Sequence, residues 1–507
     1  MPASISDADR ALSIDGLRDG LAARTARGGA IVVSAQLVKI ALQFGTIVVL
    51  ARLLDPADFG LIAMVAVLLT LLEFFKDLGL SSATVQRAEI SHAQVSALFW
   101  VNVALGLAAA LITALVAPLV AWFYGQERLV AITLWLSVGF VVSGLTTQHL
   151  AILRRQMRFG ALAAIQVSAE AGGMATAVVA ASAGAGYWAL VAQRLLWIAL
   201  MAAGAWIACR WRPAWPRRGG DVMHLIGFGG NITVSNLINF FAQNLDQILI
   251  GWYWGPVSLG LYERAIKLIL VPINNINTPL FTVFMPVLSR LTGDPDEYRR
   301  AYLRALEKIA MVTMPAAGLA IAMPDAVVRL VFGPNWNAAA PILGWLAVAM
   351  LYLPAGYTSS WLFISQDRTR DMVRWSLIST AVLVLAFGAA LPFGAVAVAA
   401  SYSLSGLFVR MPILFWLMGR TGPVGSVAIY RALAPSALAA VLVSAVAWGV
   451  SETLGRAHLA PFVDLLFAGG VGALAAGACY LFMPSSRRAL KDMARLPYIV
   501  LGRAVRS

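Results

Sequence analysis

The feature that most constrains this chain is a series of apolar runs, each roughly 20 residues long, that recur along its whole length. A helix of that length crosses about 30 Å of hydrocarbon, and lipid admits only helices or closed barrels because it offers backbone groups no hydrogen-bond partner. The runs are continuous and do not alternate, so they predict helices. A composition of 60% hydrophobic and 12% charged residues also departs from that of a soluble domain. We therefore expect an all-α polytopic membrane protein.

The runs predict about 14 transmembrane helices. Their centres lie near Leu42, Leu69, Ala108, Gly139, Ala171, Ala199, Asn239, Asn274, Met311, Ala349, Val382, Leu407, Val441 and Gly472. About 12 spans result instead if the proline-rich region from Pro324 to Pro341 only touches the membrane interface.

A stretch near the start of the chain recurs later in the same direction. The segments Ser34–Leu61 and Ser235–Leu261 both close with Pro-x-x-x-Gly-Leu, and a glycine pair precedes each of them. Two similar halves in a membrane protein indicate a transporter, because two halves can rock about a site between them.

The polar stretch from Arg210 to Asp221 is the natural boundary between these halves. The expected order is a cytoplasmic N-terminal segment (1–28), an N-terminal six-helix bundle (29–209), a cytoplasmic linker (210–224), a C-terminal six-helix bundle (225–420), two additional C-terminal helices (421–484) and a basic cytoplasmic tail (485–507). Residues 1–28 carry acidic residues and lack a compact apolar core, so they do not resemble a signal peptide. They are consistent with a short interfacial helix or with a disordered tail.

The distribution of positive charge predicts the orientation. With the N-terminus in the cytoplasm, most of the 38 Lys and Arg residues fall on the cytoplasmic side, and the opposite loops hold Arg52, Arg128, Arg329 and Arg456. This asymmetry follows the positive-inside rule and favours an even number of spans, with both termini cytoplasmic. The halves then form a parallel repeat. The net charge of +14 is explained by this bias and does not indicate nucleic acid.

Several basic residues fall inside apolar spans: Lys39, Arg194, Arg264, Lys267 and Arg410. An ionised side chain there costs several kcal/mol unless it faces a partner or a wet cavity. We therefore predict a water-filled cavity with a basic lining that binds an anionic substrate, because guanidinium and ammonium groups suit phosphate oxygens. The alternative is internal neutralisation, with Glu263 pairing with Lys267 and Asp246 with Arg264.

The predicted span near Asn274 carries prolines at Pro272, Pro279 and Pro286 with amide side chains between them. Proline removes an intrahelical hydrogen bond and kinks a helix. Pro272, Asn274 and Asn275 are therefore candidates for a hinge or a polar lining. The alternative is that the amides satisfy the freed backbone groups.

Motifs of enzyme chemistry are absent from the sequence. There is no Gly-x-x-x-x-Gly-Lys-Ser/Thr loop, no Gly-x-Ser-x-Gly elbow and no His-Glu-x-x-His motif. The 2 Cys and 4 His residues lack ligand spacing. We expect a protein that is not an enzyme, with no catalytic residues, no metal site and no cofactor.

Six segments resemble the polysaccharide-exporter family of flippases, the Wzx-type and colanic-acid-exporter-like members of the multidrug/oligosaccharidyl-lipid/polysaccharide superfamily. They are LARLLDPADFGLIAM, the acidic-Leu-Gly-Leu end at Asp77–Leu80, LRRQMRF, NLDQILIG, GLYERA and FMPVLSRL. The resemblance covers most of the chain and is strongest over residues 25–310. It implies two six-helix bundles followed by two additional helices.

The resemblance also implies a function. Members flip undecaprenyl-pyrophosphate-linked oligosaccharide units across the bacterial inner membrane for surface polysaccharide biosynthesis, and line their cavity with basic residues. It implies membrane lipids as surroundings, and a polysaccharide polymerase with its chain-length machinery as partners. Glu170, Asp246 and Glu263 are candidates for ion coupling or ion pairing. The alternatives are a cation-coupled multidrug antiporter and a peptidoglycan lipid-precursor flippase of the same superfamily.

Overall fold

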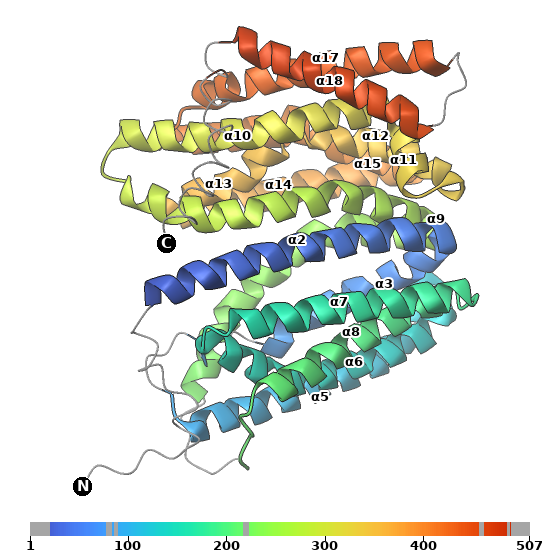
Figure 1. Ribbon diagram of the computed structural model, residues 1–507, viewed down its shortest axis with the longest axis vertical. Helices are drawn as coiled ribbons and strands as arrows, with labels where there is room; N and C mark the ends of the chain where they lie inside the picture. The colour runs from blue at the N-terminus through green and yellow to red at the C-terminus, as the bar shows by residue number, and fades with distance from the viewer. Residues whose placement is uncertain are drawn as a thin grey trace. The chain divides into compact units, whose positions relative to one another are not determined.

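The computed structural model describes residues 21–77, 84–85, 90–215, 223–455, 461–483 and 487. Helices dominate these residues, and no β-strand occurs among them (Figure 1). The prediction of an all-α protein is confirmed. The physical reason is that a helix satisfies all its interior backbone groups within one segment.

Packing divides the chain into unit 1, Met1–Val257, and unit 2, Ser258–Ser507. Unit 1 contains α2 (Leu21–Leu53), α3 (Pro56–Asp77), α5 (His92–Tyr124), α6 (Arg128–Arg155), α7 (Phe159–Ser182), α8 (Tyr187–Ala208) and the first part of α9 (Met223–Arg290). Helix α5 packs on α6, α7 packs on α8 and on α2, and α3 contacts α5, α6 and α8. The predicted linker at 210–224 overlaps the start of α9 at Met223, and its residues 216–222 lie outside the described part of the chain. The boundary between the packed units lies within α9.

Among the described residues, unit 2 contains the remainder of α9 and twelve further helical elements. These are α10 (Pro295–Ala322), α11 (Pro324–Val331), η2 (Pro334–Ala339), α12 (Ala340–Ala349), α13 (Leu353–Ser365), α14 (Thr369–Ala390), η3 (Leu391–Phe393), α15 (Ala395–Ser405), η4 (Gly406–Arg410), α16 (Met411–Arg420), α17 (Ser426–Gly455) and α18 (Pro461–Phe482). Helix α17 packs between α10 and α18, where two additional C-terminal helices are predicted.

Among the described residues, 11 helices are long and apolar enough to cross a membrane, or up to 13 if each of two bent pairs forms one span. The prediction of about 14 is not confirmed as a count. The difference arises mainly in α9, because the two spans predicted near Asn239 and Asn274 belong to one long, interrupted helix. The second bent pair is Pro334–Ala349 with Leu353–Ser365, which turn by 42°.

The proline of the repeated Pro-x-x-x-Gly-Leu motif begins a helical segment in both copies. Pro56 begins α3, and Pro256 follows Gly255, whose φ of 76° and ψ of −173° interrupt α9. Proline suits the first turn of a helix because its missing N–H has no partner there in any case. The glycine pairs that precede the two segments lie within α2 and α9, so they do not mark helix ends.

Small residues allow close approach of helices in each unit. A Cβ atom on Gly106 of α5 would lie 2.6 Å from the Phe140 carbonyl oxygen of α6, and one on Gly144 would lie 2.7 Å from the Asn102 carbonyl oxygen. In unit 2, a Cβ atom on Gly318 of α10 would overlap the backbone of α17. Association of helices in lipid depends on such close packing, because apolar burial gives little gain there.

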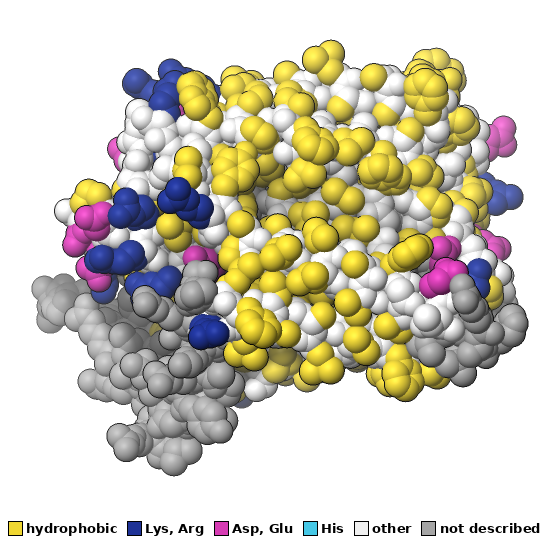
Figure 2. All heavy atoms as spheres, turned by 90° about the horizontal axis from the view of Figure 1, so that it is seen from above, with side chains coloured by type: hydrophobic (Ala, Val, Ile, Leu, Met, Phe, Trp, Pro, Cys, Tyr) yellow, Lys and Arg dark blue, Asp and Glu magenta, His cyan; other side chains and the backbone are white. Residues whose placement is uncertain are grey.

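The outer surface carries the apolar side chains that lipid requires. Figure 2 shows one face with hydrophobic side chains across its middle and Lys and Arg gathered toward one end. Exposed hydrophobic residues of α17 and α18 include Val441, Trp448, Leu466 and Leu474. The chain is therefore a multi-pass membrane protein.

The contact between α5 and α6 predicts the effect of Gly106→Ala. The added Cβ meets backbone and forces the helices apart, so we expect unfolding to become easier by about 1–3 kcal/mol. Cys209 is buried, and burial raises the pKa of its thiol, so it reacts with a thiol-reactive fluorophore only on unfolding. In a Cys479→Ala background, Cys209 should react at a lower temperature in the variant.

Gly160→Ala is the matched control in unit 1, because the nearest atom to a Cβ there would be Ile31 Cδ1 at 4.0 Å. It should leave the temperature unchanged or raise it, since alanine favours helix. Equal behaviour of both variants would contradict the close-packing account.

Candidate functional site

Arg194 and Glu73 form an ion pair inside unit 1. Arg194 Nη2 lies 3.3 Å from Glu73 Oε1, both side chains are 48% exposed, and the guanidinium carbon lies 5.1 Å from the Trp197 ring centroid. The pair lines a cavity of about 60 Å³ between α3, α6 and α8, together with Leu69, Leu136, Gly139, Phe140, Ser143 and Ile198. Because the guanidinium is half exposed, it keeps donors for a further anion.

Lys39 lies on α2, one turn before Gln43. Gln43 Nε2 donates to Glu170 Oε1 at 3.1 Å and so links α2 to α7. In the described part of the chain no carboxylate lies within 4.0 Å of Lys39 Nζ. The positive charge of Lys39 is therefore not neutralised by Glu170, whose recorded partner is an amide.

In unit 2, Glu263 forms ion pairs with two of the predicted basic residues. Arg264 Nε donates to Glu263 Oε2 at 2.7 Å, and Lys267 Nζ pairs with Glu263 Oε1. Glu263 is buried, Arg264 is largely covered and Lys267 is half exposed. The pairing of Glu263 with Lys267 expected from their spacing is present, whereas a pairing of Asp246 with Arg264 stays a prediction.

Arg410 is buried at the end of a π-helical turn, η4. Its Nη2 donates to the Tyr402 carbonyl oxygen at 2.7 Å and to the Tyr352 hydroxyl at 3.2 Å. The guanidinium carbon lies 4.7 Å from the centroid of the Tyr402 ring. Its Nε has no hydrogen-bond partner, and no carboxylate within 4.0 Å is found among the described residues. The contacts of this buried guanidinium are thus neutral oxygens and a π-face, which attracts a cation through its ring quadrupole.

The remaining predicted residues of unit 1 and unit 2 lie on α9. Asp246 is buried and accepts a hydrogen bond from the Gln247 backbone N–H at 2.8 Å. Helix α9 bends by 49° between Asn275 and Leu280, just after Pro272 and Asn274. The expected kink is therefore present, and its use as a hinge or polar lining stays a prediction.

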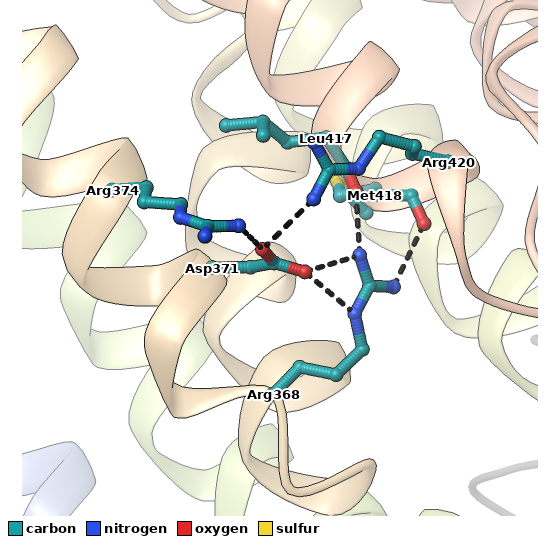
Figure 3. A network of polar contacts seen from close by, with 6 residues as sticks. All are labelled: Arg368, Asp371, Arg374, Leu417, Met418 and Arg420. Atoms are coloured by element: carbon teal, nitrogen blue, oxygen red, sulfur yellow. Dashed lines mark hydrogen bonds and ion pairs between the residues drawn. The ribbon is translucent and has the colours of Figure 1, made fainter.

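A further cluster, which the sequence did not single out, surrounds Asp371 (Figure 3). Arg368 Nε and Nη2 lie 3.1 and 2.9 Å from Asp371 Oδ2, whereas Arg374 Nη1 and Arg420 Nη2 lie 3.2 and 3.7 Å from Oδ1. Three arginines thus meet one buried carboxylate where α14 begins and α16 ends.

Arg368 also belongs to a repeated contact. It donates to the Met418 carbonyl oxygen at 2.9 Å, as Arg158 of unit 1 donates to the Ala208 carbonyl oxygen at 2.8 Å. The residues before them, Met157 and Asp367, have positive φ angles of 53° and 55°. Each arginine thereby satisfies the last carbonyls of a helix, which have no intrahelical partner. We call these two contacts the arginine pins.

The sequence contained a signal for the pins. Gln-x-Arg recurs at 156–158 and 366–368, and Trp-x-x-x-Arg recurs at 206–210 and 416–420 with the same separation. The two motifs extend the internal repeat beyond the segments that close with Pro-x-x-x-Gly-Leu. Both units therefore build one turn and one helix end in the same way.

These clusters can bind a ligand through electrostatic attraction. Basic side chains inside the spans can bind phosphate or carboxylate groups of a ligand through charge-assisted hydrogen bonds. No group of three or more His, Cys, Asp or Glu residues is placed to hold a metal ion within the described ranges. Binding and release of an anion need only a change in the exposure of these side chains.

A family model described as a polysaccharide biosynthesis protein matches residues 49–341. The teichuronic acid biosynthesis protein TuaB of Bacillus subtilis (strain 168) is 26% identical over 418 residues, which cover 80% of this chain and 84% of that protein. The lipopolysaccharide biosynthesis protein WzxC of Escherichia coli (strain K12) is 25% identical over 356 residues, 69% of this chain and 72% of that protein.

Among solved structures, the lipid II flippase MurJ in an inward closed conformation matches with a TM-score of 0.71 and 14% sequence identity. The match covers 89% of this chain and 98% of MurJ. At this identity the likeness establishes the fold alone, an all-helical polytopic fold shared with MurJ.

The pin in unit 2 predicts the effect of Arg368→Met. The change leaves the carbonyl groups of Leu417 and Met418 without a donor and weakens the hold on Asp371, so unfolding should become easier by about 2–4 kcal/mol. Cys479 is buried in α18 and reports on unit 2. In a Cys209→Ala background it should become reactive at a clearly lower temperature.

Arg370→Met is the control for that variant, since Arg370 is an exposed arginine two residues further along the chain. We expect it to change the reaction temperature of Cys479 little. If Arg370→Met and Arg368→Met shift it equally, the pin does not stabilise the helix end.

Proposed function

The chain belongs to the family of polysaccharide biosynthesis proteins, and we propose that it is a flippase for lipid-linked oligosaccharides. Its substrates are undecaprenyl-pyrophosphate-linked repeat units, which it moves across the bacterial inner membrane for surface polysaccharide biosynthesis. The similarity to TuaB and WzxC supports this pathway class, and the resemblance noted in the sequence is confirmed at the level of the family.

The observation that carries the proposal is the presence of basic side chains inside the apolar spans of both units. Lys39 and Arg194 lie in unit 1, and Arg264, Lys267 and Arg410 lie in unit 2. A charge in that position costs free energy, so basic residues inside spans usually have a function. The pyrophosphate of a lipid-linked sugar is the anion that a membrane transporter of this family meets, and guanidinium groups match its oxygens bidentately.

The proposed cycle is alternating access. The basic residues bind the pyrophosphate, the sugars occupy the wetted space beside them, and the polyprenyl chain stays in lipid. Helix α9, with its bend after Asn275, and the π-helical turn at Arg410 are the elements suited to change shape. No bond of the substrate is broken, so the protein acts as a transporter and not as an enzyme.

The orientation and coupling belong to the same proposal. The arginine-rich helix ends face the cytoplasm, both termini lie there, and the substrate leaves toward the polymerase on the outer side. An ion gradient drives the cycle, with Glu170 or Asp246 as the carboxylate that takes up the ion. Buried Asp246 supports this role, because an acid in a span is seldom only structural.

A reconstituted flipping assay tests the proposal. Proteoliposomes carry a labelled polyprenyl-pyrophosphate oligosaccharide, and its arrival in the opposite leaflet is measured. Lys39→Ala and Arg410→Ala should slow flipping at least about tenfold, because each removes one charge-assisted contact to the pyrophosphate. Arg299→Ala is the control, an exposed arginine paired with Asp296 at the start of α10.

Three outcomes separate the alternatives. Loss of flipping in the span variants with a normal control supports the basic site. Normal flipping in folded Lys39→Ala and Arg410→Ala would assign those charges to structure. If the wild-type protein moves no lipid but exchanges organic cations for protons or sodium, the protein is an antiporter.

A further inference from the structure

We propose that Arg374 and Arg420 form a second anion site, which binds the phosphate group of a membrane lipid at the end of unit 2 where α14 begins and α16 ends. The site is separate from the basic residues inside the spans. It does not depend on the substrate proposed above, because any lipid with an anionic phosphate headgroup carries the required chemistry.

The charges in this cluster do not cancel. Asp371 contributes one negative charge, and Arg368, Arg374 and Arg420 contribute three positive ones. Arg368 is covered and already donates to Asp371, Leu417 and Met418. Arg374 and Arg420 are 57% and 40% exposed, and each meets only Oδ1 of Asp371 among the carboxylate oxygens of the described residues. Their remaining N–H donors are available to a ligand.

Comparison with unit 1 shows that the fold does not need this surplus of positive charge. The pin of unit 1 has Ala161 and Ala164 at the positions of Asp371 and Arg374. Arg158 still caps the Ala208 carbonyl there without a neighbouring acid in that position. Asp371 and Arg374 are thus additions peculiar to unit 2. Their effect is to draw the Arg374 guanidinium toward Arg420 on one shared oxygen, as Figure 3 shows.

Two guanidinium groups that converge in this way make a phosphate site. Like charges repel, so the arrangement needs a carboxylate to hold it and gains from a second anion on the exposed side. Arginine presents a planar fork that matches phosphate oxygens, and a pair of forks can bind one phosphate through several charge-assisted hydrogen bonds.

The surroundings indicate that the phosphate is carried on a lipid. Val373 and Leu377 flank Arg374 and are 58% and 55% exposed, one turn apart on α14. Trp416 is also exposed, and its ring centroid lies 5.3 Å from the Arg420 guanidinium carbon. Exposed aliphatic side chains beside an aromatic ring and arginines are typical of the membrane interface, where headgroup and acyl chain meet.

Two lipids share this chemistry: an anionic phospholipid such as phosphatidylglycerol, and a polyprenyl pyrophosphate. The test uses the full chain in detergent, with native mass spectrometry to measure the binding of each lipid and of zwitterionic phosphatidylcholine. The site variant is Arg374→Gln with Arg420→Gln. The charge-matched control is Arg299→Gln with Arg300→Gln, which also removes two exposed arginines.

We expect the site variant to bind phosphatidylglycerol about tenfold more weakly, while the control stays within about twofold of the wild type. Arg368 still holds Asp371 in the site variant, and reaction of Cys479 with a thiol reagent checks that unit 2 is folded. If the double variant does not fold, Arg374→Gln alone should weaken binding in the same direction.

A loss for both lipids assigns the site to anionic lipid phosphates in general, and a loss for the pyrophosphate alone assigns it to capture of the substrate. Equal losses in the site variant and the control would mean nonspecific attraction and would overturn the proposal. Unchanged binding of both lipids in the site variant would also overturn it. Neither result bears on whether the protein flips lipid, which the transbilayer assay measures separately.

Discussion

The structure depends on one constraint: a backbone within hydrocarbon must satisfy its own hydrogen bonds. Helices meet this condition along their length, but their last carbonyls remain without intrahelical partners. At two such helix ends the arginine pins supply the missing donors: Arg158 donates to a carbonyl oxygen of α8, and Arg368 donates to one of α16. With helices satisfied, close packing holds them together, and glycines such as Gly106 and Gly318 permit it. Polar side chains inside the spans are then exceptions that need a reason, and their positions indicate function.

Much of the fold could be predicted, because apolar length alone identifies a spanning helix. The repeat at Pro56 and Pro256 also has a structural counterpart, since each proline begins a helical segment. The number of spans was harder to predict from the sequence. Gly255 interrupts α9 without ending it, and hydropathy does not distinguish a break within a helix from a loop between helices. Predicted domain limits rest on composition, whereas packing places the unit boundary after Val257.

Part of the candidate site could also be predicted from the sequence. A basic residue in an apolar run is visible in sequence, and the spacing of Glu263 and Lys267 gave their pairing. The environments of the others were not visible. Tyr352 reaches Arg410 from the turn before α13, and Arg420 reaches Asp371 from α16. Sequence spacing reports neighbours on one helix, and these partners come from different elements. The repeated Gln-x-Arg and Trp-x-x-x-Arg motifs are the signal that would have located the Asp371 cluster.

The central claim is that positive charge inside the spans moves the anionic lipid, and chemical restoration of one charge tests it most directly. Lys39→Cys is placed in a background where the buried Cys209 and Cys479 are replaced by alanine. Flipping of the polyprenyl-pyrophosphate oligosaccharide is then measured before and after reaction with methanethiosulfonates. We predict that the aminoethyl reagent, which returns an ammonium group, restores flipping, and that neutral or sulfonatoethyl reagents do not. Flipping that is unaffected by Lys39→Cys, or equally restored by a neutral adduct, would contradict the account.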